Sequence, residues 1–199
     1  MNSILFLCNH AAFFTSHRLP IALECKKNMK VKLIIGRPSS KSMEINAIKK
    51  LNRYKIKYKK FKYKSFTYNV FLDIYGFFQI FFYILGNKPN IIHLISPKCI
   101  IFGGIIAKVL NIQSVVISIS GLGSIMNIKF GFLKYIYFFL LRIVFSNKNK
   151  KIIFHNNHDL LLFKKLFNLK QSDLIITYGS GVELIKKKEK YLIKKKLFF

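Results

Sequence analysis

Short apolar runs alternate along the chain with longer segments of mixed polarity. The runs read SILFLC, VKLIIG, IIHLIS, SVVISIS, KIIFHN and DLIITYG, at residues 3–8, 31–36, 91–96, 114–120, 151–156 and 173–179. Brief runs rich in Ile and Val, closed by polar residues, are typical of strands buried on both faces of a sheet. Residues 55–61 (KIKYKKF) alternate apolar with basic residues, which predicts an edge strand that its lysines protect from further pairing.

The segments between these runs predict helices. They cover residues 16–29, 43–52, 68–85, 98–110, 130–147 and 158–167. In the first helix Ser16 can serve as the N-cap, and Lys26 and Lys27 fall in the last turn, where the helix dipole favours cations. Strands alternating with helices predict an α/β fold with a Rossmann-like, doubly wound parallel sheet. Ligands of such a sheet bind at the carboxyl ends of its strands, beside the point where the strand order reverses.

The amino-acid composition says more about which binding partners are expected than about the fold. The 199 residues suit one α/β domain, and 52% of them are hydrophobic, enough for a buried core. Lys and Arg total 35 against 7 acidic residues, a formal charge of +28, which attracts phosphate on nucleic acid, on anionic lipid or on a diphosphate substrate. The abundance of Lys, Ile, Asn and Phe also indicates an AT-rich coding sequence, so part of the lysine excess can be compositional.

The cysteines and the apolar segments indicate in which cellular compartment the protein is expected. Cys8, Cys25 and Cys99 are odd in number and far apart, which predicts small core residues in a reducing compartment and neither a metal site nor a disulfide framework. A membrane-spanning helix needs about 20 apolar residues. Residues 74–87 are fewer, and residues 130–146 include two basic residues, so we expect buried or interfacial helices. The first residues have no basic region, so no signal peptide is expected.

Polar residues follow most of the predicted strands. Asn9 to Pro20 (NHAAFFTSHRLP) offers donors at a helix start, where free N–H groups suit a phosphate or sugar hydroxyls; the alternative is a plain Ser16 cap with His17 and Arg18 in solvent. Lys98 stands at a helix start against the dipole, which indicates either a nearby anion or a surface lysine. No GxGxxG, Walker or GxSxG motif is present, and few carboxylates are available for paired acid–base catalysis. The sequence therefore identifies no catalytic residue.

Taken in order, four segments resemble family 4 glycosyltransferases of the group that builds bacterial surface polysaccharides. They are FFTSHRLPIA, the stretch from IIHLISPK through FGG to SISGLGS, KIIFHNNHDLLLF and YGSGVEL. The resemblance implies the N-terminal, acceptor-binding domain of a two-domain GT-B enzyme whose second domain binds the nucleotide-sugar. No cofactor is expected in this chain, and the nucleotide-sugar is expected in the second domain. The implied residues on the acceptor side of the cleft are His10, Phe14, Ser16, His17, Arg18, Lys98, Ser120, Gly121 and Gly123.

The resemblance also places a domain exit near residue 180. Gly179, Ser180, Gly181 and Glu183 match the loop that leaves the first domain of the family, with Glu183 in the place of an aspartate. We therefore expect a Rossmann-like domain over 1–182, and a basic tail or the start of an interdomain linker over 183–199. The donor domain is expected to lie outside this chain, and transfer is expected to need it.

The partners implied are a lipid-linked glycan acceptor, an anionic membrane surface and a separate donor-binding subunit. Residues 68–85 and 130–147, rich in Phe and Tyr, are candidates for the membrane face, with ordinary core helices as the alternative. The expected location is peripheral, on the cytoplasmic face of the bacterial plasma membrane. Two alternatives stay open: a basic nucleic-acid-binding protein, which no recognisable motif supports, and a small membrane protein.

Overall fold

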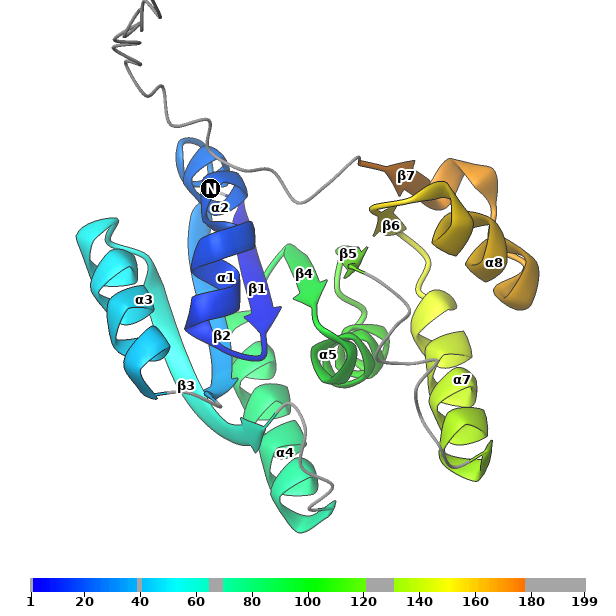
Figure 1. Ribbon diagram of the computed structural model, residues 1–199, viewed down its shortest axis with the longest axis horizontal. Coiled ribbons are helices and arrows are strands. Elements are labelled where there is room, and N and C mark those ends of the chain that lie inside the picture. The colour runs from blue at the N-terminus through cyan, green and yellow to red at the C-terminus, as the bar shows by residue number, and fades with distance from the viewer. Residues whose placement is uncertain (1, 39–40, 65–69, 121–130, 178–199) are drawn as a thin grey trace, which may run out of the picture.

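The computed structural model describes residues 2–38, 41–64, 70–120 and 131–177 (Figure 1). The strands in these residues are β1 (Ser3–Cys8), β2 (Lys30–Arg37), β3 (Lys57–Lys64), β4 (Ile91–Ile95), β5 (Ser114–Ile119), β6 (Lys150–Phe154) and β7 (Leu174–Ile176). The helices are α1 (Ala11–His17), α2 (Leu19–Lys26), α3 (Lys41–Arg53), α4 (Val70–Asn87), α5 (Pro97–Val109), α7 (Gly131–Phe145) and α8 (Asn157–Phe167), and a 3-10 turn covers Gln171–Asp173.

The strands form one parallel sheet in the order β3-β2-β1-β4-β5-β6-β7. This order confirms the predicted α/β, Rossmann-like sheet, and β3 is the edge strand that its lysines indicated. Ile4 of β1 pairs with Val31 of β2 on one side and with Ile91 of β4 on the other. The order reverses between β1 and β4, so the expected ligand crevice lies at the carboxyl ends of these two strands.

Helices cover the sheet in two layers, because successive side chains of a strand point to opposite faces. Ile4 and Phe6 of β1 belong to a core cluster with side chains of α1, α2 and α3. Leu5 and Leu7 belong to the other cluster, with side chains of α4, α5, α7 and α8. The strands are apolar on both faces for this reason, as the near-continuous Ile and Val runs predicted.

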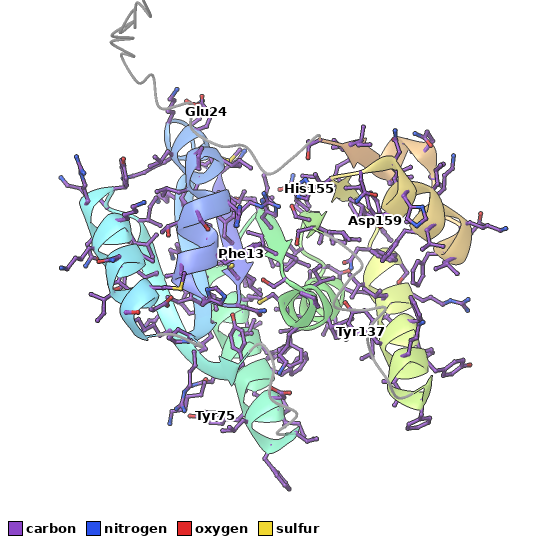
Figure 2. All side chains as sticks on the ribbon, viewed as in Figure 1. Phe13, Glu24, Tyr75, Tyr137, His155 and Asp159 are labelled. Atoms are coloured by element: carbon purple, nitrogen blue, oxygen red, sulfur yellow. The ribbon has the colours of Figure 1, made fainter. Side chains whose placement is uncertain are left out.

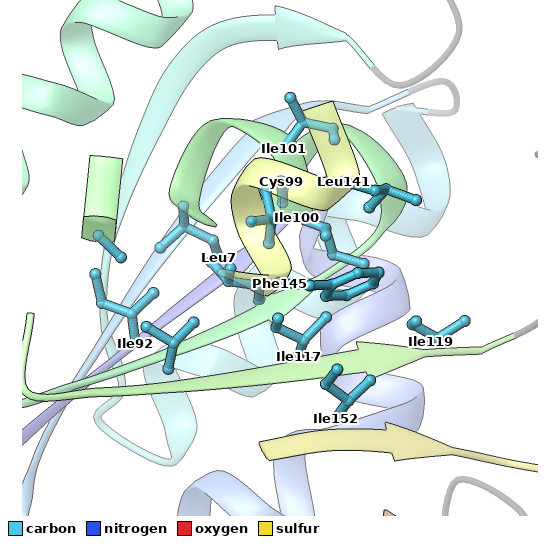
Figure 3. Close-up of a cluster of buried hydrophobic side chains, with 14 of the residues drawn as sticks. Leu7, Ile92, Cys99, Ile100, Ile101, Ile117, Ile119, Leu141, Phe145 and Ile152 are labelled. Carbon is cyan, nitrogen blue, oxygen red and sulfur yellow. The ribbon is translucent and has the colours of Figure 1, made fainter. Parts of the chain in front are cut away.

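Helix α5 is the centre of the second layer (Figure 3). Its Cys99 and Ile100 belong to the same buried cluster as Leu7 of β1. The close approach depends on two glycines. A Cβ at Gly103 would lie 2.2 Å from Leu94 Cδ2, and a Cβ at Gly104 would lie 2.4 Å from Val144 Cγ1 of α7. The glycine pair therefore lets α5 pack against the sheet and α7 at distances that a side chain would prevent.

The helical region after β1 differs from the prediction. A helix begins at Ala11, not at Ser16, and the chain turns at Arg18 before Pro20 in the first turn of α2. Ser16 is in the last turn of α1, where its hydroxyl donates to the carbonyl oxygens of Ala12 and Phe13 at 2.9 and 3.1 Å. The prediction that Ser16 caps the helix was wrong. A serine hydroxyl can equally donate a hydrogen bond back to a carbonyl oxygen of its own helix, and the sequence pattern does not distinguish the two arrangements.

Helices α4 and α7 expose long aromatic faces. Both begin at the lower edge of the molecule in Figure 1, on either side of α5. The exposed large side chains of α4 are Val70, Phe71, Ile74, Tyr75, Phe78, Phe82 and Leu85, and those of α7 are Phe132, Tyr135, Ile136 and Phe139. Helix α4 has 18 residues with a mean hydropathy of 1.4, of which 17% are buried, so its length and composition would allow it to cross a membrane.

Candidate functional site

Two side chains occupy the start of α1, directly after the carboxyl end of β1. His10 is the N-cap, and its Nδ1 accepts a hydrogen bond from the backbone N–H of Phe13 at 3.2 Å. Glu44 of α3 is 5% exposed, and its two carboxylate oxygens accept from the N–H groups of Ala11 and Ala12 at 3.1 and 3.2 Å. A carboxylate is stabilised at this positive end of the helix. The sequence predicted that the start of the first helix would suit a phosphate or sugar hydroxyls, and the observed start holds an anion from the chain itself.

Arg18 connects the first two helices to the residue that follows β6. The residue is 2% exposed and lies between α1 and α2. Its Nη1 donates to the carbonyl oxygen of His17 at 3.2 Å, and its Nη2 lies 3.0 Å from Nε2 of His155, which follows β6. Among the described residues, its Nε has no hydrogen-bond partner. Burial disfavours the charged form and lowers the pKa of Arg18.

The contact with Arg18 defines the protonation of His155. A guanidinium has donors and no acceptor, so Nε2 of His155 accepts and its proton is on Nδ1. Nδ1 lies 3.1 Å from Oγ1 of Thr177 and 3.4 Å from its carbonyl oxygen. Thr177 follows β7, and Figure 2 shows His155 between β6 and the layer of α1 and α2. Residues far apart in sequence thus meet at the carboxyl ends of the strands, which form one edge of the sheet.

A buried histidine lies in the same region. His93 of β4 is 3% exposed, and its Nε2 is 2.8 Å from Oγ of Ser118 on β5. Its ring packs against Phe6 with 5.1 Å between the ring centres. Burial, and after it the charge of Arg18, lowers the pKa of His93 to about 3. The imidazole is therefore neutral, and it adds no charge beside Arg18.

The crevice between β1 and β4 holds a network of neutral groups. The hydroxyl of Tyr63 donates to the carbonyl oxygen of Cys8 at 2.8 Å, and Sγ of Cys99 donates to Oδ1 of Asn9 at 3.4 Å. Ser96, the N-cap of α5, has φ = 94°, and its Oγ accepts from the N–H of Asn9 at 3.4 Å. Burial raises the pKa of Cys8 to about 11, so this thiol is protonated and structural, as the sequence predicted.

Lys98 has the nearby anion that its position indicated. Its Nζ lies 2.8 and 2.9 Å from the two carboxylate oxygens of Asp73 on α4, and the side chains are 17% and 23% exposed. The anion is thus a side chain of the protein. The pair joins the first turn of α5, at the crevice, to the first turn of α4, where the exposed aromatic face begins.

The other expected acceptor residues lie in different surroundings. Phe14 is fully buried and packs edge-on against Phe6, with 5.4 Å between the ring centres. Ser16 is exposed on α1, His17 packs against Phe13 at 4.6 Å, and Ser120 is exposed directly after β5. Gly121 and Gly123, and the exit loop residues Gly179, Ser180, Gly181 and Glu183, lie outside the described residues.

Several residues of this edge were missed from the sequence. His155 directly follows β6 and Ser118 lies near the end of β5, so the rule that ligands bind at the carboxyl ends of the strands was an available signal for both residues. Glu44 and His93 had no such signal. Glu44 is a residue within α3, and His93 is in the middle of β4, so only the packing of the chain brings them to the first helix and to Arg18.

The chain matches one protein family and is similar to several solved structures. Residues 3–156 match the family described as Glycosyl transferase 4-like. No curated protein matches the chain by sequence. Similar solved structures include Alr3699/HepE of Anabaena in complex with UDP and glucose, with a TM-score of 0.60, 11% identity and coverage of 90% of this chain and 45% of that one. MurG of Acinetobacter baumannii matches with a TM-score of 0.55 and 14% identity, over 94% of this chain and 48% of that one. A UDP-N-acetylglucosamine 2-epimerase matches with a TM-score of 0.60 and 13% identity, over 89% of this chain and 46% of that one.

These comparisons define the family and the fold separately. The chain spans less than half the length of each of these structures, and at such identities they support the fold alone. The family match, in contrast, covers more than half of the chain and includes the first helix, the crevice and His155. With its parallel sheet in the order described, the chain belongs to the Glycosyl transferase 4-like family.

Proposed function

We propose that this chain supplies the acceptor-binding half of a GT-B glycosyltransferase that acts at a membrane surface. The transferred sugar would come from a nucleotide-sugar held by a second Rossmann-like domain. The acceptor would be a lipid-linked glycan used to build a bacterial surface polysaccharide, on the cytoplasmic face of the plasma membrane. Family membership supports the transfer reaction, and the polar edge around Arg18, Lys98 and Ser120 supports binding at the carboxyl ends of the strands.

The observation that carries this proposal is the aromatic surface of α4 and α7. Phe71 is 86% exposed, and Phe132 and Tyr135 are each 75% exposed. Contiguous apolar faces of this kind on a folded protein indicate a partner or a membrane. Both helices begin at the same edge of the molecule in Figure 1, so their first turns can enter one flat surface together.

The charges beside α4 favour an anionic membrane as that surface. The neighbouring edge strand β3 exposes Lys59, Lys60 and Lys62. The ammonium group of Lys62 lies 5.6 Å from the ring centre of Tyr75, which Figure 2 shows on the outer side of α4. Each basic side chain near an anionic leaflet contributes about 1 kcal/mol of attraction. Aromatic residues with adjacent lysines are typical of helices that lie in the membrane interface.

The packing of α4 supports peripheral attachment over a membrane span. Ile80 and Ile84 are fully buried in the core, and Gln79 accepts a hydrogen bond from the backbone of Lys62 at 3.0 Å. Asp73 is paired with Lys98. A spanning α4 would have to leave these contacts, whereas a helix lying at the surface keeps all of them. Washing membranes at alkaline pH should therefore release the protein, and retention in the pellet would support a span instead.

Vesicle binding tests the aromatic surface. The double variant Phe71→Ser with Phe132→Ser should bind phosphatidylglycerol vesicles at least ~10-fold more weakly than wild type, because burying one exposed Phe contributes about 1.5–3 kcal/mol. The matched control is Met43→Ser with Leu161→Ser, two side chains that are each 64% exposed on α3 and α8. Equal losses in both double variants would contradict the assignment of α4 and α7 as the docking face.

Acceptor binding tests the transferase role itself. Wild-type protein should bind nanodiscs that contain a polyprenyl-diphosphate-linked glycan more tightly than otherwise identical nanodiscs without it. Tight, steeply salt-dependent binding to duplex DNA, with no preference for the lipid-linked glycan, would favour a nucleic-acid-binding protein.

A further inference from the structure

Arg18 is a buried cation with an unused donor. In the part of the chain that the structure describes, two buried side-chain polar atoms lack a hydrogen-bond partner, Nε of Arg18 and the hydroxyl of Tyr137. The Arg18 residue is 2% exposed. A buried charge without a counter-ion is far more costly than a buried neutral group, so Arg18 calls for an explanation in terms of an anion.

The described carboxylates do not supply that anion. Each of the five is engaged elsewhere: Glu24 with Lys27, Glu44 with the start of α1, Asp73 with Lys98, Asp159 with Asn156 and Asp173 with Lys150. Within residues 2–38, 41–64, 70–120 and 131–177, therefore, Arg18 has no carboxylate partner.

The titratable neighbours of Arg18 do not supply the anion either. Burial raises the pKa of the Cys8 thiol to about 11, so at neutral pH it carries no negative charge. His93 is neutral because burial and Arg18 lower its pKa to about 3. His155 accepts a hydrogen bond from Arg18 as a neutral imidazole. The region around the guanidinium consequently has a net positive charge.

We propose that Arg18 binds a diphosphate group of the substrate at this edge of the sheet. Phosphate geometry matches a guanidinium, whose Nε and Nη groups offer parallel donors, and burial strengthens such charge-assisted bonds. The start of α1, the other anion site after β1, is filled by Glu44, which would repel a phosphate there. The inference rests on the proposed function in one respect: the source of the diphosphate is the lipid-linked acceptor.

Calorimetric titration with inorganic pyrophosphate tests the site, at about 0.15 M salt so that diffuse attraction to the basic surface is screened. Arg18→Gln should bind pyrophosphate at least ~10-fold more weakly than wild type. The matched control is Arg53→Gln, which removes an exposed arginine of α3 whose guanidinium lies 6.0 Å from the ring centre of Tyr54. Its affinity should stay within about twofold of wild type.

Stability without ligand separates binding from support of the fold. Because Arg18 is an uncompensated buried charge, Arg18→Gln should melt at the temperature of the wild type or above it. If Arg18→Gln does not fold, Arg18→Lys keeps the charge without the planar fork, and it should fold and bind pyrophosphate more weakly. Wild-type affinity in a folded Arg18→Gln or Arg18→Lys variant, or a lower melting temperature of Arg18→Gln with unchanged affinity, would overturn the proposal.

The source of the diphosphate is tested with two soluble probes. Geranyl diphosphate should bind wild type at least as tightly as pyrophosphate does and should lose affinity in Arg18→Gln. If UDP shows the Arg18-dependent binding and geranyl diphosphate does not, Arg18 remains a diphosphate site while its assignment to the acceptor fails. The phosphate site and the proposed acceptor role can therefore fail independently.

Discussion

Replacing Gly104 by alanine should destabilise the protein, although alanine is the better helix former. The new Cβ would lie 2.4 and 2.7 Å from the two γ-methyl groups of Val144 and 3.0 Å from its Cβ. Ordinary carbon contacts begin near 3.5 Å, so α5 and α7 would have to separate by about 1 Å. Val144 is fully buried, and a valine in a helix has one strongly preferred rotamer, so it cannot turn away.

The two opposing effects can be compared in size. Alanine in place of glycine in a helix gains about 1 kcal/mol, whereas overpacking a core with one methyl group typically costs about 1–3 kcal/mol and sometimes more. Because the contact here is short and its partner stiff, the cost is expected at the upper end of that range. The net loss should be about 1–2 kcal/mol in the free energy of unfolding, or several degrees in melting temperature.

Urea denaturation followed by circular dichroism measures this change. Gly86 of α4 is the matched control, because it also lies in a helix and a Cβ there meets no atom within 4 Å. Gly86→Ala should stabilise the protein by up to about 1 kcal/mol, so the two variants should move in opposite directions. The packing argument is refuted if Gly104→Ala unfolds at the same or a higher urea concentration than wild type.

Two further predictions concern buried ionisable groups. Burial lowers the pKa of His93 from 6.5 to about 3, so between these values the unfolded chain binds more protons and stability falls with decreasing pH, by about 1.4 kcal/mol per pH unit. Urea unfolding at pH 7 and pH 5 should show a smaller loss of unfolding free energy at pH 5 in His93→Gln than in wild type. The control variant His158→Gln, at an exposed histidine, should lose as much as wild type, and equal losses in all three proteins would contradict this role of His93. Glu44→Gln should lower the free energy of unfolding by about 1–2 kcal/mol in the same assay at pH 7, because it removes a charge bound to the start of α1. The control Glu24→Gln, which removes an exposed pair with Lys27, should lower it by less than about 0.5 kcal/mol. Similar losses in the two variants would refute this role of Glu44.

The order of elements could be predicted from the sequence because the signal is local. An apolar run such as SILFLC reports the burial of its own strand, and the polar residues after it report where that strand ends. The lysines of β3 likewise indicated an edge strand, since a central strand would bury them. The start of α1 was misplaced by several residues because His10, not Ser16, is the cap, and both residue types accept or donate in more than one arrangement.

The candidate site depends on contacts that no local pattern contains. Arg18 and His155 are 137 positions apart, and Glu44 reaches α1 from 33 positions away. Hydrophobic pattern also identified α4 as an apolar helix without showing which of its faces meets the core. Sequence alone therefore determined the α/β alternation and the strand ends at which function would lie. Tertiary structure decided that Glu44 fills the anion position at the start of α1 and that Arg18 is left without a carboxylate partner among the described residues. It also decided that the aromatic faces of α4 and α7 remain exposed. The reason is that burial and charge pairing are properties of the packed chain.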